Sequence, residues 1–283
     1  MNALIFVDTN ILLDFYRVRS GGGGLELLNL IEAHKDVLIT GSQVEMEYKK
    51  NRQRVILEAL KAQKTPDWSS LTSPAFLADA KPAQAIAKSK KTITTQQKKL
   101  MTRIANILEK PSISDPVFKT LSRVFKNNCE YNLTRDKKIR FKIRNLARKR
   151  FVLGYPPRKQ NDTSIGDAVN WEWIVHCAED SGKDIIIVTR DTDYGVSYGE
   201  KFFLNDWLLL EFKERINQRR KIVLTDRLAW AFKLVAISVS AKAEQEEKDL
   251  VEELSAKLPS LKCEATAITQ PSTSADALQP ARG

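Results

Sequence analysis

The sequence contains few of the residues that build zinc sites, histidine relays or disulfide frameworks. Its 283 residues include only two histidines and three cysteines. Because Cys129, Cys177 and Cys263 are odd in number and far apart in the chain, we expect no disulfide framework and a reducing, cytoplasmic environment. His34 and His176 have no partners at ligand spacing, which disfavours a mechanism built on a histidine-rich metal site or a histidine relay.

Long hydrophobic runs are also missing. No apolar run approaches the roughly 18 residues that a membrane span requires. The N-terminal sequence MNALIFVDTN has an acid directly after its apolar stretch and no basic region before it, so we expect no secretory signal peptide. Both absences predict a protein that does not enter a membrane, although 42% apolar and 8% aromatic residues suffice for a sizeable core.

Basic side chains, in contrast, are in excess. The chain has 46 Lys and Arg against 35 Asp and Glu, a formal net charge of +11 at pH 7. Residues 48–103 hold 13 basic and three acidic side chains, and residues 135–150 hold nine basic and one acidic. Such blocks favour a polyanionic partner, because neutralised phosphates release counterions. A merely solvated basic surface is the alternative.

Five short apolar runs are typical of β-strands. The first, ALIFV, ends at Asp8, and the clearest, DIIIVT, is followed by a turn-rich stretch. Strands that alternate with helical patterns indicate an α/β fold with a mainly parallel sheet. The predicted strands are residues 3–7, 37–40, 184–189, 201–204 and 221–225.

The composition divides the chain into four parts. A core is predicted from residues 1–55 and 156–226, interrupted by a basic, helical insertion over 56–155 without convincing strands. Residues 227–258 are expected to form C-terminal helices, of which the last is charged and exposed. Residues 259–283 are rich in Ser, Thr, Ala, Pro and Gln, which predicts a disordered tail.

Four acids stand where a parallel sheet presents its ligands, beyond strand ends or at adjoining helix starts. Asp8 ends the first strand, Asp191 follows DIIIVT, Asp167 begins a helix, and Glu45 or Glu47 lies on the helix after the second strand. Taken singly, each is explained as a helix cap or a turn residue. Clustered carboxylates without histidine are hard oxygen ligands, which suit Mg²⁺ or Mn²⁺.

Helix geometry separates the two glutamates. Residues two apart on a helix differ by about 200° in direction, so both cannot face one site. Ser42 and Glu45 match a helix capping box, which already gives Glu45 a structural task. Glu47 is therefore the better candidate ligand.

Four segments together resemble a PIN-domain nuclease, most closely the larger PIN-like family first catalogued as a domain of unknown function. They are VDTNILLDFYR, QVEMEYKKNR, GYPPRKQNDTSIGDAVNWEW and IIIVTRDTDYG. The resemblance implies a Rossmannoid sheet and metal ligands at Asp8, Glu47, Asp167 and Asp191. It also implies auxiliary roles for the small polar residue Asn10 and for Thr189.

The same resemblance implies an activity. PIN domains are typically single-strand-directed, metal-dependent endoribonucleases, and many are toxins held by an antitoxin. The large insertion and the C-terminal helix of this chain depart from the small toxins, so nuclease chemistry is the stronger inference. An antitoxin or a second copy of the chain is a possible partner.

Further residues are candidates for the metal site or for contacts with the substrate. Asp193 would assist the metal site or form a turn, and Glu172 lies about 140° around its helix from Asp167, as a buried or auxiliary acid. The basic residues expected to contact nucleic acid, with a solvated face as the alternative, are Lys49, Lys50, Arg52, Arg144, Arg148, Lys149 and Arg150.

These observations favour a divalent-metal-dependent nuclease that acts as an endoribonuclease on single-stranded or structured RNA. A non-catalytic PIN-like nucleic-acid-binding scaffold and a DNA-directed nuclease remain as alternatives. A haloacid-dehalogenase-type phosphohydrolase is disfavoured, because Asn10 occupies the place of its second aspartate.

Overall fold

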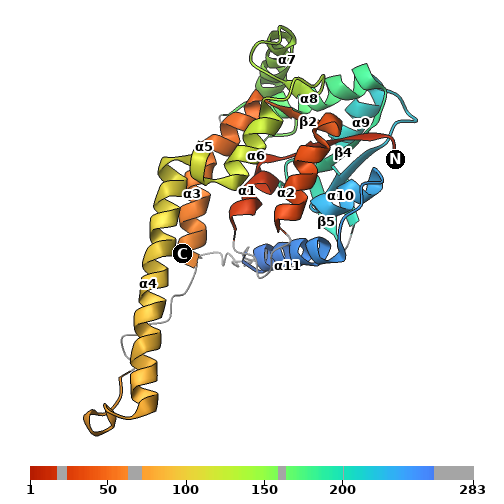
Figure 1. The fold of residues 1–283 in the computed structure, drawn as a ribbon. Coiled ribbons are helices and arrows are strands. Elements are labelled where there is room, and N and C mark those ends of the chain that lie inside the picture. The colour runs from red at the N-terminus through yellow and green to blue at the C-terminus, as the bar shows by residue number, and fades with distance from the viewer. Residues whose placement is uncertain (18–23, 63–71, 159–163, 200, 258–283) are drawn as a thin grey trace, which may run out of the picture.

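The computed structural model describes residues 1–17, 24–62, 72–158, 164–199 and 201–257, and it has the predicted α/β architecture (Figure 1). Its centre is a parallel five-stranded sheet in the order β3–β2–β1–β4–β7, and β5 and β6 form a separate antiparallel hairpin. The strands are β1 (Ala3–Val7), β2 (Leu38–Gly41), β3 (Asn132–Leu133), β4 (Asp184–Val188), β5 (Gly195–Tyr198), β6 (Lys201–Leu204) and β7 (Ile222–Thr225).

Helices flank the sheet and supply most of the remaining apolar core. The described residues also form the short 3₁₀ helices η1 (Asp14–Tyr16), η2 (Lys35–Val37) and η4 (Ala75–Leu77). The α-helices are α1 (Thr9–Leu13), α2 (Gly24–Ala33), α3 (Ser42–Ala62), α4 (Lys81–Glu109), α5 (Pro111–Ser114), α6 (Pro116–Phe125), α7 (Ile139–Leu153), α8 (Gly166–Ser181), α9 (Asp206–Arg215), α10 (Leu228–Leu234) and α11 (Ala241–Lys257).

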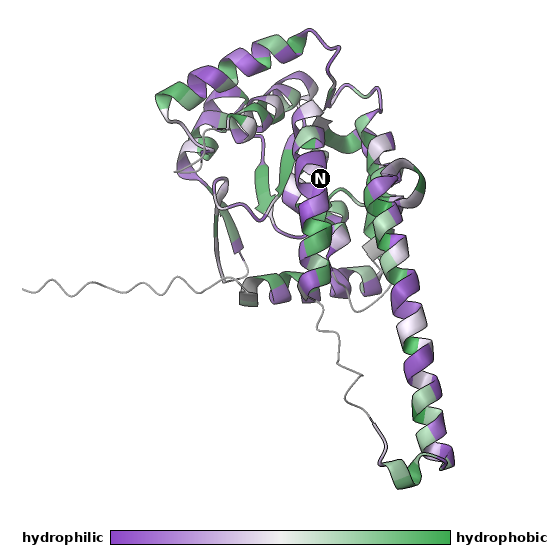
Figure 2. Ribbon diagram, turned by 90° about the vertical axis from the view of Figure 1, so that its left-hand side faces the viewer, coloured by the Kyte–Doolittle hydropathy of each residue, from purple (hydrophilic) through white to green (hydrophobic). Residues whose placement is uncertain are grey.

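The central pair of strands positions the candidate site. β1 and β4 are nearly continuous apolar runs, as expected of parallel strands covered on both faces (Figure 2). Their register pairs Val7 with Val188, and the backbone N–H of Asp8 donates to the Val188 carbonyl at 3.0 Å. The residues that follow the two strands, Asp8 and Thr189, therefore emerge side by side at the carboxyl edge of the sheet.

The helical insertion is smaller than the sequence predicts. β3 pairs with β2 in the main sheet, with Asn132 opposite Thr40, and α6 packs against α2 with Leu121 fully buried. The predicted boundary at residue 55 falls inside α3, which continues to Ala62. A two-residue strand is too short to show alternation, so the sequence pattern missed it. The element that projects from the core is α4 (Figure 1).

The strand predicted over 201–204 is present as β6, but it does not join the parallel sheet. It pairs with β5, with Val196 opposite Phe203. The close packing of this hairpin requires glycine at position 195, because a Cβ there would lie 2.1 Å from the Phe203 carbonyl oxygen. The hairpin begins two residues after Asp193 and so anchors the end of the loop that follows β4.

The C-terminal helices predicted over 227–258 are present as α10 and α11, but α11 is not the exposed helix that its charge pattern predicts. Leu250 is buried, and the Glu247 carboxylate accepts hydrogen bonds from the backbone N–H groups of Leu228 and Ala229 at 2.7 and 2.8 Å. Glu247 thereby satisfies donors that the start of α10 leaves open.

Two expectations concern the remaining parts of the chain. Across the residues that the structure describes, none of the helices combines the length and apolar character needed to cross a membrane. The predicted disordered tail, residues 259–283, lies outside the described residues.

Candidate active site

Asp8 lies at the carboxyl end of β1, where three donors hold its carboxylate. Oδ1 accepts a hydrogen bond from the backbone N–H of Thr9 at 2.6 Å. Oδ2 accepts from Asn10 Nδ2 at 2.8 Å and from the Thr189 hydroxyl at 2.5 Å. Asn10 Nδ2 and Thr189 Oγ1 are themselves 3.2 Å apart. The two predicted auxiliary residues therefore contact Asp8 directly and fix the direction in which its carboxylate points.

The surroundings of Asp8 are electrically negative. Its pKa is raised to about 6, chiefly because burial penalises the charged form. The hydrogen bond from Thr189 lowers this pKa, whereas the charges of Asp191 and Glu47 raise it. The charges of two other carboxylates thus destabilise the ionised form of the Asp8 carboxylate, and a bound cation would reduce this repulsion.

Glu47 is the glutamate of α3 that faces Asp8. Its Oε2 accepts a hydrogen bond from the Thr9 hydroxyl at 3.2 Å, and its Oε1 accepts from Gln43 Nε2 at 2.6 Å. Glu45 instead accepts from Lys49 Nζ at 2.6 Å. The two glutamates point to different sides of the helix, as their spacing predicts.

Gly166, the first residue of α8, allows α3 and α8 to approach each other at the site. A Cβ at this position would lie 2.2 Å from Glu47 Oε1 and 2.8 Å from Gln43 Nε2. The absence of a side chain at Gly166 therefore lets Glu47 lie beside the first turn of α8, which carries Asp167. The sequence offered Gly166 only as part of the GDAVNWEW segment and gave no sign of this contact.

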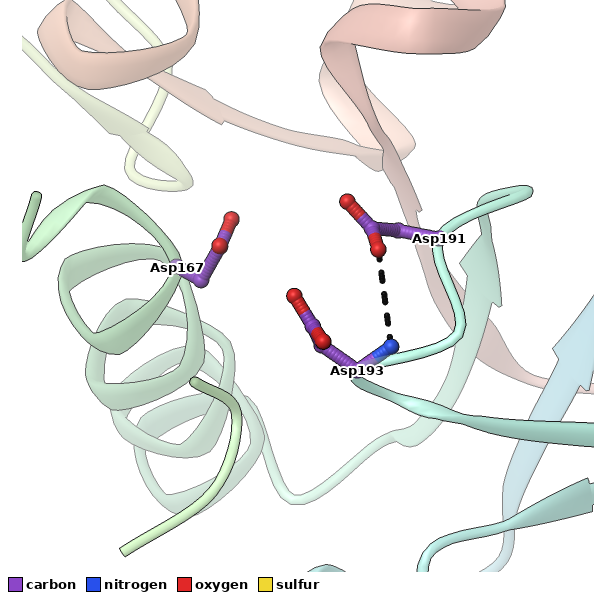
Figure 3. Close-up of side chains that lie close together, drawn as sticks. All are labelled: Asp167, Asp191 and Asp193. Atoms are coloured by element: carbon purple, nitrogen blue, oxygen red, sulfur yellow. Dashed lines mark hydrogen bonds between the residues drawn. The ribbon is translucent and has the colours of Figure 1, made fainter. Parts of the chain in front are cut away.

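Asp167, Asp191 and Asp193 form a tight acidic cluster (Figure 3). Each offers one carboxylate oxygen, and these oxygens lie within 4.8 Å of one another. Asp167 belongs to the first turn of α8, whereas Asp191 and Asp193 follow β4. The backbone N–H of Asp191 donates to Thr189 Oγ1 at 2.9 Å, and that of Asp193 to Asp191 Oδ1 at 3.5 Å. Asp193, for which a turn role was the alternative, thus lies in the cluster.

The donor set fits a hard divalent cation. All the donors are carboxylate oxygens, which suit Mg²⁺ or Mn²⁺ better than soft metals. The field they create extends to their neighbour Tyr194, whose pKa is raised first by burial and then by the charges of Asp167 and Asp8. Several like charges around one point are the arrangement that a cation stabilises.

A cleft of about 340 Å³ joins these acids to basic side chains. All four predicted ligands, Asp8, Glu47, Asp167 and Asp191, line it. Arg17, Lys50 and Arg54 line the same cleft. One cavity therefore offers carboxylates for a cation and cations for phosphate groups.

Asp14 and Arg17 are functional candidates that the sequence analysis missed. The Asp14 side chain is 1% exposed and forms ion pairs with Arg17 and Arg190. Arg190 directly precedes Asp191, so a buried carboxylate holds one arginine in the cleft and another beside the acidic loop. Asp14 and Arg17 are both in VDTNILLDFYR, but a partner 176 residues further along the chain, at position 190, gave no signal in the sequence.

The prediction that Arg52 contacts nucleic acid is wrong. Its side chain is 3% exposed and binds the buried carboxylate of Asp115, with Nη2 to Oδ2 at 2.6 Å. It also donates to the carbonyl of Ile107 at 2.7 Å and to the Tyr16 hydroxyl at 3.0 Å. Arg52 therefore ties α3 to the end of α4 and the start of α6, and its side chain is too deeply buried to contact a phosphate.

The prediction that Arg150 contacts nucleic acid is also wrong, whereas Glu172 has the first of its two predicted roles, that of a buried acid. Arg150 Nε donates to Glu172 Oε1 at 2.8 Å, and Arg215 Nη1 donates to Glu172 Oε2 at 2.9 Å. Glu211 pairs with both arginines and completes the group. Glu172 is buried, as predicted, but its two oxygens serve this ion network between α7, α8 and α9 and not the metal site.

The other predicted basic contacts lie on the surface. Arg144, Arg148 and Lys149 are exposed on α7, and their role toward nucleic acid stays a prediction. Lys50 lines the cleft. Its neighbour Lys49 points elsewhere, because it pairs with Glu45 and its Nζ lies 5.8 Å from the centre of the Phe118 ring.

A family model described as a PIN domain matches residues 5–194. No curated protein and no solved structure matches the chain. The matched segment runs from β1 to the loop after β4 and contains every acid of the site described above. PIN domains are generally nucleases, and their substrates are nucleic acids. By this match and by its parallel sheet with acids at the carboxyl edge, the chain belongs to the PIN domain family.

Proposed function

We propose that the chain is a divalent-metal-dependent nuclease that hydrolyses phosphodiester bonds in RNA. One observation carries the proposal: the four candidate ligands and three basic side chains line a single cleft. Carboxylates at one point and guanidinium or ammonium groups beside them match the two needs of phosphodiester cleavage, a held cation and a held polyanion.

Each part of the site has a role in this proposal. Asp167, Asp191 and Asp193 would hold Mg²⁺ or Mn²⁺, with Asp8 and Glu47 completing the carboxylate set. Such an ion, when bound, makes water a stronger nucleophile and stabilises the leaving oxygen. The side chains that contact Asp8 keep its carboxylate in a fixed direction, which is the preorganisation that a catalytic metal site needs.

The basic side chains of the cleft would position the substrate. Arg17, Lys50 and Arg54 would neutralise the phosphates next to the one that reacts, without taking part in the chemistry. The ion pair with buried Asp14 limits the directions in which Arg17 can point. RNA is proposed over DNA because the sequence motifs resemble endoribonucleases of the PIN type.

A cleavage assay tests this function. Purified protein is incubated with labelled single-stranded RNA and, separately, with single-stranded DNA, in Mg²⁺, in Mn²⁺ or in EDTA. We expect endonucleolytic products from RNA with either ion and none in EDTA. Equal cleavage in EDTA would contradict the metal mechanism, and cleavage of DNA alone would contradict the substrate.

Two variants distinguish cleavage by the proposed site from cleavage by a contaminating nuclease. Asp191→Asn removes one ligand charge, and Glu45→Gln removes an acid on the same protein that lies outside the cleft. Activity that persists in Asp191→Asn does not come from the proposed site. Activity that falls equally in both variants reflects damage to the fold.

A further inference from the structure

Helix α4 projects from the core as an arm. It spans Lys81–Glu109, 29 residues, and none of them is buried. At 1.5 Å per residue it is about 43 Å long, which is longer than the diameter of a small domain. Figure 1 and Figure 2 both show most of its length extending beyond the body of the protein.

The charges of α4 are almost all of one sign and lie on one side. The helix carries seven basic side chains and a single acid, Glu109, at its end. With 100° between successive residues, six of the seven basic residues fall within an arc of about 140°. All six are exposed, and they are Lys81, Lys88, Lys91, Lys98, Lys99 and Arg103.

The opposite side of the arm is the less exposed one. Ile93, Ile104 and Ile107 lie there, and the last two line an apolar cavity together with Ile56 and Leu60 of α3. The remaining basic residue, Lys90, also falls on this side. The six-residue basic stripe therefore faces solvent and not the core.

The basic stripe destabilises the isolated helix, because its positive charges repel one another. Lys88 and Lys91 are three residues apart, and Lys99 and Arg103 are four apart, so like charges meet on the helix surface. An ordinary solvated helix face relieves such repulsion by mixing in acids, and α4 contains none between Lys81 and Arg103. Its single acid, Glu109, lies on the same side but six residues beyond Arg103. A bound polyanion would remove the repulsion.

The arm is attached on the side of α3 that faces away from the cleft. Arg52 donates to the carbonyl of Ile107 in α4 at 2.7 Å. It lies two residues from both Lys50 and Arg54, which line the cleft, and hence about 200° away around α3. Nucleic acid bound along the basic stripe would thus lie apart from the catalytic cleft.

We propose that the basic stripe of α4 is a second nucleic-acid-binding surface, which captures a segment of the substrate remote from the bond to be cleaved. The ligand is a phosphate backbone, recognised by charge and not by base sequence. The proposal rests on the proposed function for its choice of nucleic acid as the polyanion, and it concerns binding alone. It predicts that long substrates are held at two places and short ones only in the cleft.

A binding titration without divalent metal tests the stripe independently of cleavage. In the arm variant, Lys88, Lys91, Lys98 and Lys99 are replaced together by Gln, which keeps helix propensity close to that of Lys. Binding of single-stranded RNA and of duplex RNA, each of about 30 residues per strand, is measured in EDTA at several salt concentrations. The slope of log K against log salt should become shallower by about 3 for the single strand and by up to about 4 for the duplex, if each Lys contacts one phosphate.

A control with the same change in net charge accompanies this variant. Lys119, Lys126, Lys242 and Lys248 are exposed and lie on α6, directly after it, or on α11. Their joint replacement by Gln should leave both slopes within about one unit of wild type. Equal losses in the two quadruple variants would mean that only net charge matters, and the proposal would be wrong. Far-ultraviolet circular dichroism checks that α4 still forms.

A short RNA and single substitutions at two neighbouring lysines provide two further binding tests of the stripe. A single-stranded RNA of about six nucleotides, near the site size of one small binding domain, should bind equally to wild type and to the arm variant. Lys91→Gln should weaken binding of the long RNA several-fold more than Lys90→Gln, because only Lys91 belongs to the stripe. Unchanged binding of long RNA by the arm variant would overturn the proposal, whether or not the protein cleaves RNA.

Binding of the protein to anionic vesicles of phosphatidylserine and phosphatidylcholine is measured as well, because a basic amphipathic helix can also lie on a membrane surface. We expect no binding to these vesicles that depends on the stripe. If the vesicles bind wild type but not the arm variant, and both proteins bind RNA equally well, then the ligand of the stripe is lipid and not nucleic acid.

Discussion

The molecule contains two kinds of acidic cluster, and they differ in how their charge is compensated. In the buried networks each carboxylate has an arginine: Asp115 pairs with Arg52, and Glu172 with Arg150 and Arg215. At the carboxyl edge of the sheet, Asp167, Asp191 and Asp193 present oxygens to one another within 4.8 Å. The first arrangement stabilises the fold, whereas the second brings several carboxylate oxygens to one point, which suits a divalent cation.

The buried ion pairs show why the sequence predicts the role of a basic residue less well than that of an acidic one. Arg52 and Arg150 occur in the same basic blocks as Lys50 and Arg148, yet they are 3% and 4% exposed. An arginine in a basic block can thus either neutralise a buried acid or bind a phosphate. Which of the two it does depends on the residues that the fold brings opposite to it.

The largest effect should come from breaking a compensated pair. Arg52→Met leaves the carboxylate of Asp115 buried without its cation, which we expect to lower the free energy of unfolding by about 3–5 kcal/mol. Arg54→Met, two residues away and exposed, should change it by less than about 1 kcal/mol. Chemical denaturation of both variants measures the difference, and similar values for the two would show that the Arg52 pair has no special role.

Removing an acid of the candidate metal site should affect activity and spare the fold. Asp191→Asn is expected to lower the rate of RNA cleavage at least about a hundredfold, because a lost ligand charge misplaces the cation. Asp8→Asn should have a similar effect on cleavage. Glu45→Gln should be milder than Glu47→Gln, and it should cost only about 0.5 kcal/mol of helix stability, the value of its i,i+4 pair with Lys49. If Glu45→Gln is the more damaging to cleavage, the assignment of Glu47 to the site is wrong.

The raised pKa of Asp8 makes a prediction about metal-free protein. Between the unfolded value of 3.8 and the folded value of about 6, the folded chain binds a proton that the unfolded chain releases. Ionisation of Asp8 therefore destabilises the fold as the pH rises through this window. Asp8→Asn should raise the unfolding free energy at pH 8 by up to about 3 kcal/mol, because each pKa unit corresponds to about 1.4 kcal/mol, although it should remove activity. Thermal unfolding in EDTA would contradict this account if the variant were less stable.

The same group sets the pH dependence of metal binding. A ligand carboxylate must be ionised, so affinity for Mn²⁺ should fall as the pH is lowered through about 6. The Asp8→Asn variant, which retains the acidic cluster but lacks this titrating group, should show a flatter pH profile. Identical profiles for the two proteins would exclude Asp8 as the group responsible.

The smallest expected effect is a difference in the salt dependence of RNA binding between substitutions at two adjacent lysines. Lys50 lines the cleft and Lys49 pairs with Glu45 outside it. Lys50→Gln should reduce the salt slope for single-stranded RNA by about 0.7, the contribution of one phosphate, and Lys49→Gln should leave it unchanged. Equal slopes in the two variants would mean that the cleft does not hold the backbone through Lys50.

Much of this site could be predicted from the sequence, because its residues stand next to signals that are local. The runs ALIFV and DIIIV predict buried parallel strands, and the acids that follow such strands meet at one edge. The spacing of Glu45 and Glu47 on one helix was enough to separate their directions. These inferences needed only the period of a helix or a strand and the order of the elements.

The rest depended on long-range partners that no local pattern contains. Asp115 lies 63 residues from Arg52, and Glu172 lies 22 residues from Arg150. β3 has two residues, fewer than one alternation of side chains, so the segment around it was assigned to an insertion. The role of Gly166 depends on how closely α8 approaches Glu47, a distance that only the packed structure supplies.

Binding of Mn²⁺ to metal-free protein tests the central claim most directly, namely that the clustered acids at the carboxyl edge of the sheet form a cation site. The loss of the electron paramagnetic resonance signal of free Mn²⁺ on addition of protein at pH 7.5 counts the bound ions, without nucleic acid and without turnover. We expect saturable binding to wild type and to Glu45→Gln, and binding weakened at least tenfold in both Asp167→Asn and Asp191→Asn. Undiminished binding in these two aspartate variants, or none in wild type, would contradict the account.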